Sequence, residues 1–424
     1  MQKKSLTQIL HNDSLKWAYD ICKWVYLKSS SIVFYAVRGV VSLRPLQNKV
    51  VATAYNGKRY DDNTRYIVEK IHELDPDIPI VWLMDVKASY ELPSYIKGVR
   101  CWSQYKFLRR IYEYCTAKVV LDTHLIDTFY KKRRGQLFIE TWHGGLGIKK
   151  IELDVEKYTK LKSHVRKIQN TSRQADIFIS NSDHLSNIYR RAFKRKKKIW
   201  KCGYPKNDEL VTISEDELKA IRKKVRDYFH VPEDYKLITY APTFRDETRI
   251  KGIFKKEWYD LDPEGTVEAF KKMFGDEKCL LLYKLHPFLI ANSEEYLSEL
   301  QTSVQNATKY PDMQELIMAS DACISDYSSC IFDAALFGMP CFTFANDFEE
   351  YKGDRGVYFE MEDLPFPYAK NVEELHYNIL HFDKEQYDAD WKAFVETVGL
   401  KETGHAGRDI AEYICRFIKK KRER

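Results

Sequence analysis

Short apolar runs alternate with longer amphipathic stretches through most of the chain. The runs in the first half are residues 49–54, 80–84, 118–121, 137–139 and 177–179. The stretches with helical spacing between them include residues 63–74, 104–114 and 184–193. Runs of this length are typical of buried strands, and strands that alternate with helices predict a parallel, doubly wound sheet.

The same alternation begins again after Gly203-Tyr204-Pro205, which has the composition of a linker. The later strands are predicted at 236–240, 280–283, 321–324 and 340–344, with helices at 214–229 and 312–319. We therefore expect an α/β fold of two Rossmann-like domains that face a cleft (the GT-B architecture), at residues 47–202 and 203–383. Residues 384–424 are predicted to form a helical tail that crosses back to the first domain. A dehydrogenase is disfavoured because Gly-x-Gly-x-x-Gly is absent from the first strand–helix turn.

Length and composition agree with two buried cores. The 424 residues are too many for one ordinary domain, and 44% of them are hydrophobic and 14% aromatic. The nine cysteines form no Cys-x-x-Cys pair and no zinc-type spacing. We therefore expect reduced thiols in the core of a cytosolic protein, with no structural metal and no cofactor.

The first 46 residues form a segment of different character, rich in basic and aromatic residues. Residues 1–44 hold seven basic and two acidic residues, a balance of +5, within a chain of net charge +7. The segment has no signal-peptide pattern and no apolar stretch long enough to span a bilayer. A helix of this composition suits an anionic membrane surface, and the alternative is an arm packed on the enzyme or on a second subunit. Nucleic acid is disfavoured as a partner because no binding motif accompanies the charge.

The segment Ser325-Asp326-Tyr327-Ser328-Ser329 follows an apolar strand and precedes a predicted helix. Free N–H groups at the helix start, together with the hydroxyls of Ser328 and Ser329, suit a phosphate. A plain serine N-cap is the alternative. Asp333 lies one turn further on, where it either accepts a hydrogen bond from a ribose hydroxyl or is only a carboxylate that is solvated or stabilised by the helix dipole. Asp326 is expected either to belong to the nucleotide- and phosphate-binding residues or only to cap the turn.

Two histidines also follow apolar strands, in Thr141-Trp142-His143-Gly144-Gly145 and in Lys284-Leu285-His286-Pro287. Open α/β sheets bind ligands at such strand ends. A neutral imidazole at His143 suits a general base, and Gly144 and Gly145 leave room for a polyol phosphate beside Trp142. His286 could donate a hydrogen bond to a pyrophosphate and stabilise its leaving group. In each case the alternative is a histidine that only stabilises its own loop.

Arg245, in Ala241-Pro242-Thr243-Phe244-Arg245, offers a planar fork for a phosphate, and Thr243 adds a hydroxyl. An exposed, salt-bridged arginine is the alternative. Asn207 and Asp208 are expected to shape the mouth of the cleft. The remaining histidines are expected to be packing or surface residues: His124, His164, His184, His230 and His405.

Together these segments resemble the CDP-glycerol glycerophosphotransferase family of teichoic-acid and capsule enzymes. The matching pieces, in order, are residues 140–144, 203–208, 241–245, 284–287, 325–329 and 355–359. They extend over most of the chain, from about residue 50 to about residue 407. After His143-Gly144 this chain has Gly145-Leu146-Gly147-Ile148-Lys149, where the family has Thr-Pro-Leu-Lys. The acceptor loop therefore differs from the usual form.

The resemblance implies transfer of glycerol phosphate from CDP-glycerol to a hydroxyl of a lipid-linked teichoic-acid or capsule acceptor, with release of CMP. It implies that His143 is the base, that His286 and Arg245 stabilise phosphate charge, and that the protein is peripheral on the cytoplasmic face of the cell membrane. A CDP-ribitol or other polyol-phosphate transferase, a GT-B glycosyltransferase using a nucleotide sugar, and a non-catalytic nucleotide-binding scaffold are the alternatives. A homo-oligomer is left open.

Overall fold

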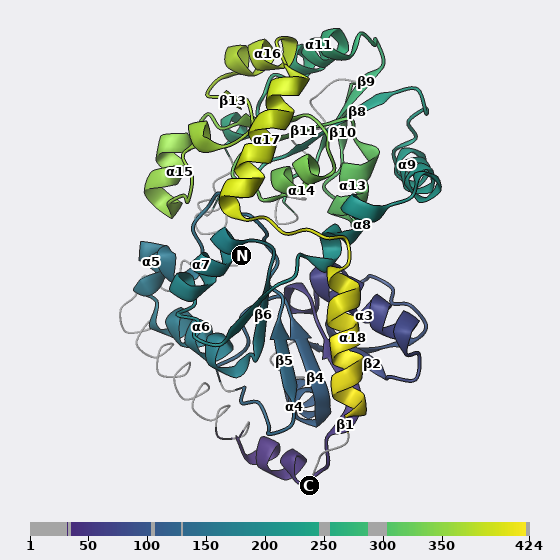
Figure 1. Cartoon of the computed structure of the whole chain (residues 1–424), viewed down its shortest axis with the longest axis vertical. Coiled ribbons are helices and arrows are strands. Elements are labelled where there is room, and N and C mark those ends of the chain that lie inside the picture. The colour runs from purple at the N-terminus through teal and green to yellow at the C-terminus, as the bar shows by residue number, and fades with distance from the viewer. Residues whose placement is uncertain are drawn as a thin grey trace, which may run out of the picture.

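The computed structural model describes residues 35–102, 107–128, 130–245, 255–286 and 303–420, together with Ile32. Within these residues the chain forms two parallel sheets, each covered by helices, which lie one above the other in Figure 1. The short segment Pro205–Asn207 joins the two sheets in sequence.

The first sheet has the order β3-β2-β1-β4-β5-β6-β7, and all its described pairings are parallel. Its strands are β1 Gln47–Ala52, β2 Ile80–Asp85, β3 Ile96–Trp102, β4 Ala117–Asp122, β5 Leu137–Glu140, β6 Ile177–Ser180 and β7 Lys198–Lys201. The chain reverses its direction of strand addition between β1 and β4. A crevice forms at the carboxyl ends of the strands at such a point, and ligands bind there in open α/β sheets.

The second sheet has the order β10-β9-β8-β11-β12-β13, again parallel throughout its described part. Its strands are β8 Lys236–Ala241, β9 Cys279–Tyr283, β10 Val304–Asn306, β11 Ala322–Ser325, β12 Cys341–Phe344 and β13 Tyr368–Ala369. The corresponding reversal lies between β8 and β11, so the loops after these strands meet at one edge.

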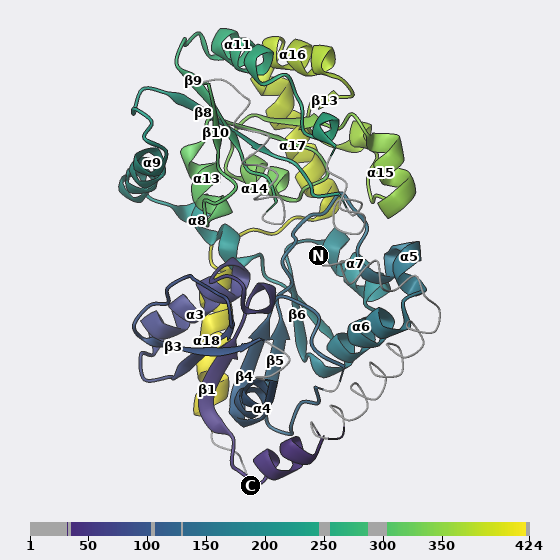
Figure 2. The same ribbon diagram turned by 180° about the vertical axis from the view of Figure 1, so that it is seen from behind.

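Helices cover both sheets (Figures 1 and 2). Those of the first half are α3 Asp62–Leu74, α4 Phe107–Thr116, α5 Glu156–Thr159, α6 Lys162–Gln174 and α7 Asp183–Ala192. Those of the second half are α8 Asp208–Thr212, α9 Glu215–Phe229, α11 Pro263–Phe274, α13 Met313–Ala319, α14 Cys330–Leu336, α15 Phe348–Arg355 and α16 Val372–Leu380. Local chemistry sets several of their ends. For example, Ser214 and Glu217 form a reciprocal capping box at α9, and His230 ends that helix in a left-handed conformation.

The tail consists of α17 Lys384–Val398, which covers the second sheet, and α18 Ala406–Lys419, which packs against α3 of the first domain. Both helices are yellow in Figure 1. Ile410, Ile414 and Ile418 recur every four residues along α18 and are buried in the core of the first domain. Lys118 of β4 donates to the backbone oxygen of Ile418 at 2.6 Å, which fixes the end of α18.

The expected N-terminal membrane segment, residues 1–46, lies mostly outside the described residues; within it, residues 35–42 are helical. In the described part of the chain, no helix combines the length and the apolar character that crossing a bilayer requires. The eight described cysteines are free, and seven of them are buried.

Candidate active site

Two adjoining cavities lie where the loops of the two sheets meet. The inter-domain cavity, of about 780 Å³, is lined by loops after β1 and β4 on one side and after β8, β9 and β11 on the other. The second cavity, of about 660 Å³, extends from it beneath the loop after β5 and along α6 and α7. Six residues line both cavities: Asn56, His124, His143, Lys149, Tyr158 and Arg355. The two cavities therefore meet around His143.

His143 is half-buried and follows β5, in the loop that separates the two cavities. Its Nδ1 lies 2.8 Å from the backbone oxygen of Thr123. Because a carbonyl oxygen can only accept, Nδ1 carries the hydrogen and the neutral ring keeps a lone pair on Nε2. Burial lowers the pKa of His143 below its usual value, although the carboxylate of Asp62 opposes that shift. The geometry thus provides a neutral imidazole that can accept a proton through Nε2.

His124 was expected to be a packing or surface histidine, and that expectation is wrong. It lines both cavities, and its ring stacks on that of His143 with centroids 4.3 Å apart. Burial, followed by the nearby His143 and Lys58, lowers the pKa of His124 well below the usual value. This contact could not be predicted from the sequence, because β4 and β5 become neighbours only in the sheet. His124 therefore fixes one face of the candidate base.

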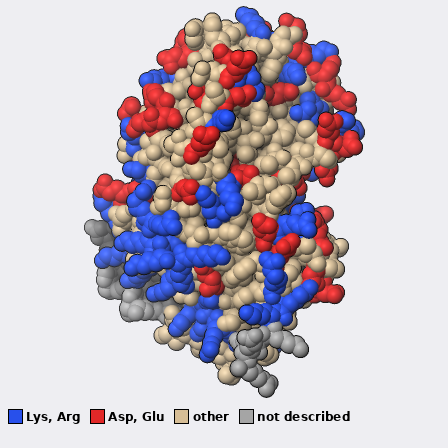
Figure 3. All heavy atoms as spheres, in the orientation of Figure 1, with Lys and Arg blue, Asp and Glu red and all other residues tan. Residues whose placement is uncertain are grey.

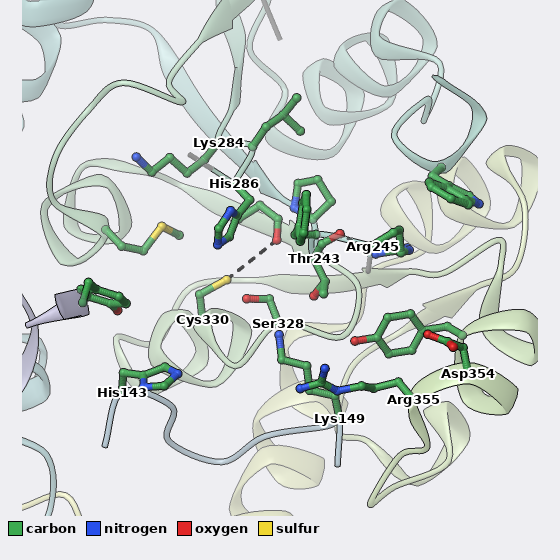
Figure 4. Close-up of a pocket in the computed structure, with 18 of the residues that line it drawn as sticks. His143, Lys149, Thr243, Arg245, Lys284, His286, Ser328, Cys330, Asp354 and Arg355 are labelled. Carbon is green, nitrogen blue, oxygen red and sulfur yellow. Dashed lines mark hydrogen bonds between the residues drawn. The ribbon is translucent and has the colours of Figure 1, made fainter. Parts of the chain in front are cut away.

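His286 follows β9 and faces the inter-domain cavity from the second domain, opposite His143 (Figure 4). Its ring is open to the cavity, yet the surrounding protein removes enough solvent to lower its pKa to about 4, with Lys149 adding to the shift. His286 is thus neutral near pH 7, where it can donate a hydrogen bond without carrying charge. Pro287, expected to orient this loop, lies outside the described residues.

Arg245 is buried, and its guanidinium is engaged by two carboxylates. Nε and Nη2 donate to Asp347 at 2.7 and 2.8 Å, and Nη1 donates to Asp326 at 2.7 Å. These contacts favour the salt-bridged alternative over the phosphate fork, although the arginine is buried rather than exposed. Asp326 also accepts from the backbone N–H of Thr243 at 2.7 Å and from that of Tyr327, so it holds the turn.

Thr243 and Ser328 line the inter-domain cavity, whereas Ser329 lines the second cavity. The Thr243 hydroxyl is buried and has no hydrogen-bond partner within the described residues. Ser329 precedes α14 but makes no side-chain capping bond, so a plain serine N-cap does not account for it. The two serines thus lie on opposite sides of the junction.

Trp142, Gly144 and Gly145, predicted from the sequence to form an acceptor loop, line the second cavity. Trp142 adopts a left-handed conformation with φ of 54°. A Cβ at Gly145 would lie 3.2 Å from the amide of Asn181 and 3.4 Å from the ring of Tyr204. This tight fit leaves room for little beyond glycine at that position.

The structure places Asp333, Asn207 and Asp208 away from both cavities. Asp333 is buried and pairs with Lys206 at 2.6 Å, and Asn207 donates to it at 3.1 Å. Asp208 accepts from the backbone N–H groups of Ala406 and Gly407 at 2.9 and 2.7 Å. These residues tie the inter-domain linker to α14 and α18. They neither shape the cleft mouth nor offer a carboxylate to a ribose.

Several cations in the cavities were not anticipated from the sequence. Lys149 and Arg355 line both cavities and lie close together in Figure 4. Burial, and then the charge of Arg355, lowers the pKa of Lys149 to about 8. Lys58 and Arg59 add further positive charge to the inter-domain cavity, whereas burial lowers the pKa of Lys284 to about 7. The site as a whole suits an anion with more than one phosphate.

Comparison with known proteins gives a consistent result. A family model described as CDP-Glycerol:Poly(glycerophosphate) glycerophosphotransferase matches residues 35–416. The teichoic acid poly(glycerol phosphate) polymerase of Staphylococcus epidermidis is 30% identical over 383 residues, which cover 87% of this chain and 51% of that protein. The teichoic acid glycerol-phosphate transferase of Staphylococcus aureus is 27% identical over 390 residues, which cover 90% and 96%. The chain therefore spans about half the length of the first relative and nearly all of the second.

Among solved structures, that of the wall teichoic acid polymerase TagF, as a single-residue variant, superposes with a TM-score of 0.77 at 26% identity. The match covers 94% of this chain and 97% of that one. The same polymerase variant soaked with CDPG gives the same TM-score and identity. A teichoic acid ribitol-phosphate primase of Bacillus spizizenii is also similar, at 25% identity over 89% of this chain and 93% of that protein.

Proposed function

Because the chain belongs to the CDP-glycerol:poly(glycerophosphate) glycerophosphotransferase family, we propose that it transfers glycerol phosphate from CDP-glycerol to an acceptor hydroxyl and releases CMP. The observation that carries this proposal is the position of His143 at the junction of two cavities. A transferase needs one site for each substrate and a base where they meet. The acceptor would be the hydroxyl end of a lipid-linked teichoic-acid or capsule polymer.

In this mechanism the acceptor oxygen attacks the β-phosphorus of CDP-glycerol. A new P–O bond forms, the bond between the β-phosphorus and the bridging oxygen breaks, and CMP leaves with that oxygen. The acceptor proton passes to Nε2 of His143, whose Nδ1 is fixed by the Thr123 carbonyl. The stacked ring of His124 keeps the imidazole in this orientation.

The donor would lie in the inter-domain cavity with its pyrophosphate between the two domains. Thr243 and Ser328 supply hydroxyl donors from the second domain, and Lys149 and Arg355 supply positive charge. His286 would donate a hydrogen bond to the pyrophosphate as negative charge develops on CMP. Arg245 acts indirectly, since its ion pairs with Asp326 and Asp347 hold the loop that carries Thr243.

The test is nucleotide release by purified protein given a lipid-linked acceptor mimic and, in parallel, CDP-glycerol, CDP-ribitol and UDP-sugars. We expect CMP from CDP-glycerol. If CMP is released from CDP-ribitol alone, the mechanism stands but the transferred group is ribitol phosphate. The similarity to a ribitol-phosphate primase favours this alternative. Release of UDP from a sugar donor would overturn phosphotransfer and indicate a glycosyltransferase. Tight binding of CMP without turnover would indicate the non-catalytic nucleotide-binding scaffold.

We also propose that the protein acts at the cytoplasmic face of the membrane as a peripheral protein. Residues 156–198 carry 13 basic and three acidic residues, a balance of +10 that exceeds the net +7 of the whole chain. Figure 3 shows basic side chains gathered on the half of the molecule that holds α5, α6 and α7. A face of this charge is attracted to anionic lipid, near which a lipid-linked acceptor would be found.

Lys162, Arg166 and Arg173 are exposed and share one face of α6, so they offer a test of this orientation. Changing all three to Gln should weaken binding to phosphatidylglycerol vesicles by about 100-fold, at about 1 kcal/mol per charge. Vesicle co-sedimentation at two salt concentrations measures the effect. Three exposed lysines of α9 changed to Gln serve as the matched control: Lys219, Lys223 and Lys224. Equal losses in the two triple variants would contradict the orientation.

A further inference from the structure

A carboxylate–imidazole pair in the second cavity has no part in the mechanism above. Glu152 begins the turn Glu152–Asp154, and His164 lies on α6; both line this cavity. Glu152 Oε2 lies 2.6 Å from His164 Nε2, and the Glu152 side chain is only 10% exposed. The ring of Tyr158 packs edge-on against His164 at 5.1 Å. His164, expected to be a packing or surface histidine, thus packs against Tyr158 and also pairs with Glu152 at a cavity wall.

The backbone at Glu152 is strained. Its φ of 48° places it in the left-handed region, which a residue with a Cβ adopts at a cost in free energy. The surrounding chain holds it there: the Tyr358 hydroxyl bonds both to the backbone N–H of Ile151 at 3.1 Å and to Asp154 at 2.8 Å. Because the neighbouring residues enforce this backbone conformation, the Glu152 carboxylate has a fixed position at the cavity wall.

The charges around the pair indicate which ligand group it would accept. Lys149, Lys167 and Arg355 line the same cavity and suit phosphate oxygens. A buried carboxylate repels phosphate but accepts hydrogen bonds from hydroxyl groups, with capacity beyond its contact with His164. Glu152 is also close enough to His143 to raise the pKa of that ring. The pair thus lies within electrostatic reach of the point where an acceptor hydroxyl would react.

We propose that Glu152, held in place by His164, binds the hydroxyl-bearing end of a polyol phosphate acceptor and thereby selects for it. Lys167 holds the acceptor phosphate, with Lys149 and Arg355 shared between this phosphate and the donor pyrophosphate at the junction of the cavities, and Glu152 holds the terminal hydroxyls. This inference rests on the proposed function, because it assigns the second cavity to the acceptor.

The experiment measures acceptor binding to the whole protein without nucleotide, so that it does not depend on the donor. The probes are a synthetic lipid ending in one glycerol phosphate unit and its analogue lacking the terminal hydroxyls. Glu152→Gln should raise the Kd for the natural end about 10- to 100-fold, since a hydrogen bond to a charged group is lost. The wild type should bind the deoxy analogue as weakly, and Glu152→Gln should discriminate little between the two probes.

Two further variants separate recognition from folding. Glu152→Gly removes the carboxylate but relieves the positive φ, so its Tm should equal or exceed that of the wild type while its Kd rises. Glu156→Gln removes an exposed carboxylate four residues away, and its Kd should stay at the wild-type value. Unchanged binding of both probes by Glu152→Gln and Glu152→Gly would overturn the inference. If the Kd for the acceptor probe depends on Glu152 but the protein releases no CMP from CDP-glycerol, the inference about Glu152 stands and CDP-glycerol is rejected as the donor.

Discussion

Replacing His143 with Ala is expected to lower the rate of CMP release by about two to four powers of ten. His143 lies at the junction of the two cavities that we propose for donor and acceptor, and its Nε2 is the atom that would take the acceptor proton. The cost to folding should be small, because the ring is only half-buried and borders open space. Steady-state CMP release and thermal unfolding, measured on the same preparation, separate the two effects.

The pH dependence provides an independent check on this role. Burial lowers the pKa of His143, so the neutral, proton-accepting form persists to pH values below the usual 6.5 of a histidine. The wild-type rate should therefore hold as pH falls toward 6.5 and decline only below it, as the ring becomes protonated. His381→Ala, at an exposed histidine that follows the end of α16, serves as the control. Turnover by His143→Ala close to that of this control would exclude His143 as the base.

Replacing Arg245 with Met should destabilise the protein by about 3–5 kcal/mol, because breaking a buried ion pair leaves uncompensated charge. Arg245 is 4% exposed, and its removal would leave the carboxylates of Asp326 and Asp347 without their common partner. Its guanidinium also packs over the rings of Tyr327 and Tyr351. Urea unfolding measures the free energy directly.

Arg59→Met is the matched comparison, since Arg59 lines the same cavity with a more exposed side chain. Arg59→Met should keep nearly wild-type stability. If Arg245→Met instead unfolds at the wild-type urea concentration and loses only CDP-glycerol binding, the phosphate fork predicted from the sequence is the correct role. The two variants thus distinguish a structural arginine from a phosphate ligand.

The interior of each sheet could be predicted from the sequence, but its edges could not. The apolar runs correspond to β1, β2, β4, β5 and β6 in the first sheet and to β8, β9, β11 and β12 in the second. The four strands that escaped prediction are β3, β7, β10 and β13, which are the edge strands of the two sheets. Edge strands face solvent on one side and are short or charged, as in Lys198–Lys201, so their hydrophobic pattern is weak.

The candidate site divides in a similar way. His143 and His286 could be found because each follows a recognisable strand in a short segment of distinct composition. The contacts of His124, Lys149 and Glu152 depend on which loops the fold brings together. No short sequence pattern predicts these contacts. Asp333 illustrates the converse case: helical spacing placed it near Ser329, but its partner Lys206 comes from the linker, 127 residues earlier.

The path of α18 has a consequence for how the protein is made on the ribosome. Ile410, Ile414 and Ile418 complete the core of the first domain, yet they are among the later residues to be translated. The six described strands of the second sheet lie between residues 236 and 369, so that domain can form its sheet while synthesis continues. Domains usually fold in the order in which they emerge. Here the first of the two domains must wait for α18 before its core is closed, and its unfinished surface is exposed to chaperones while the second domain is translated.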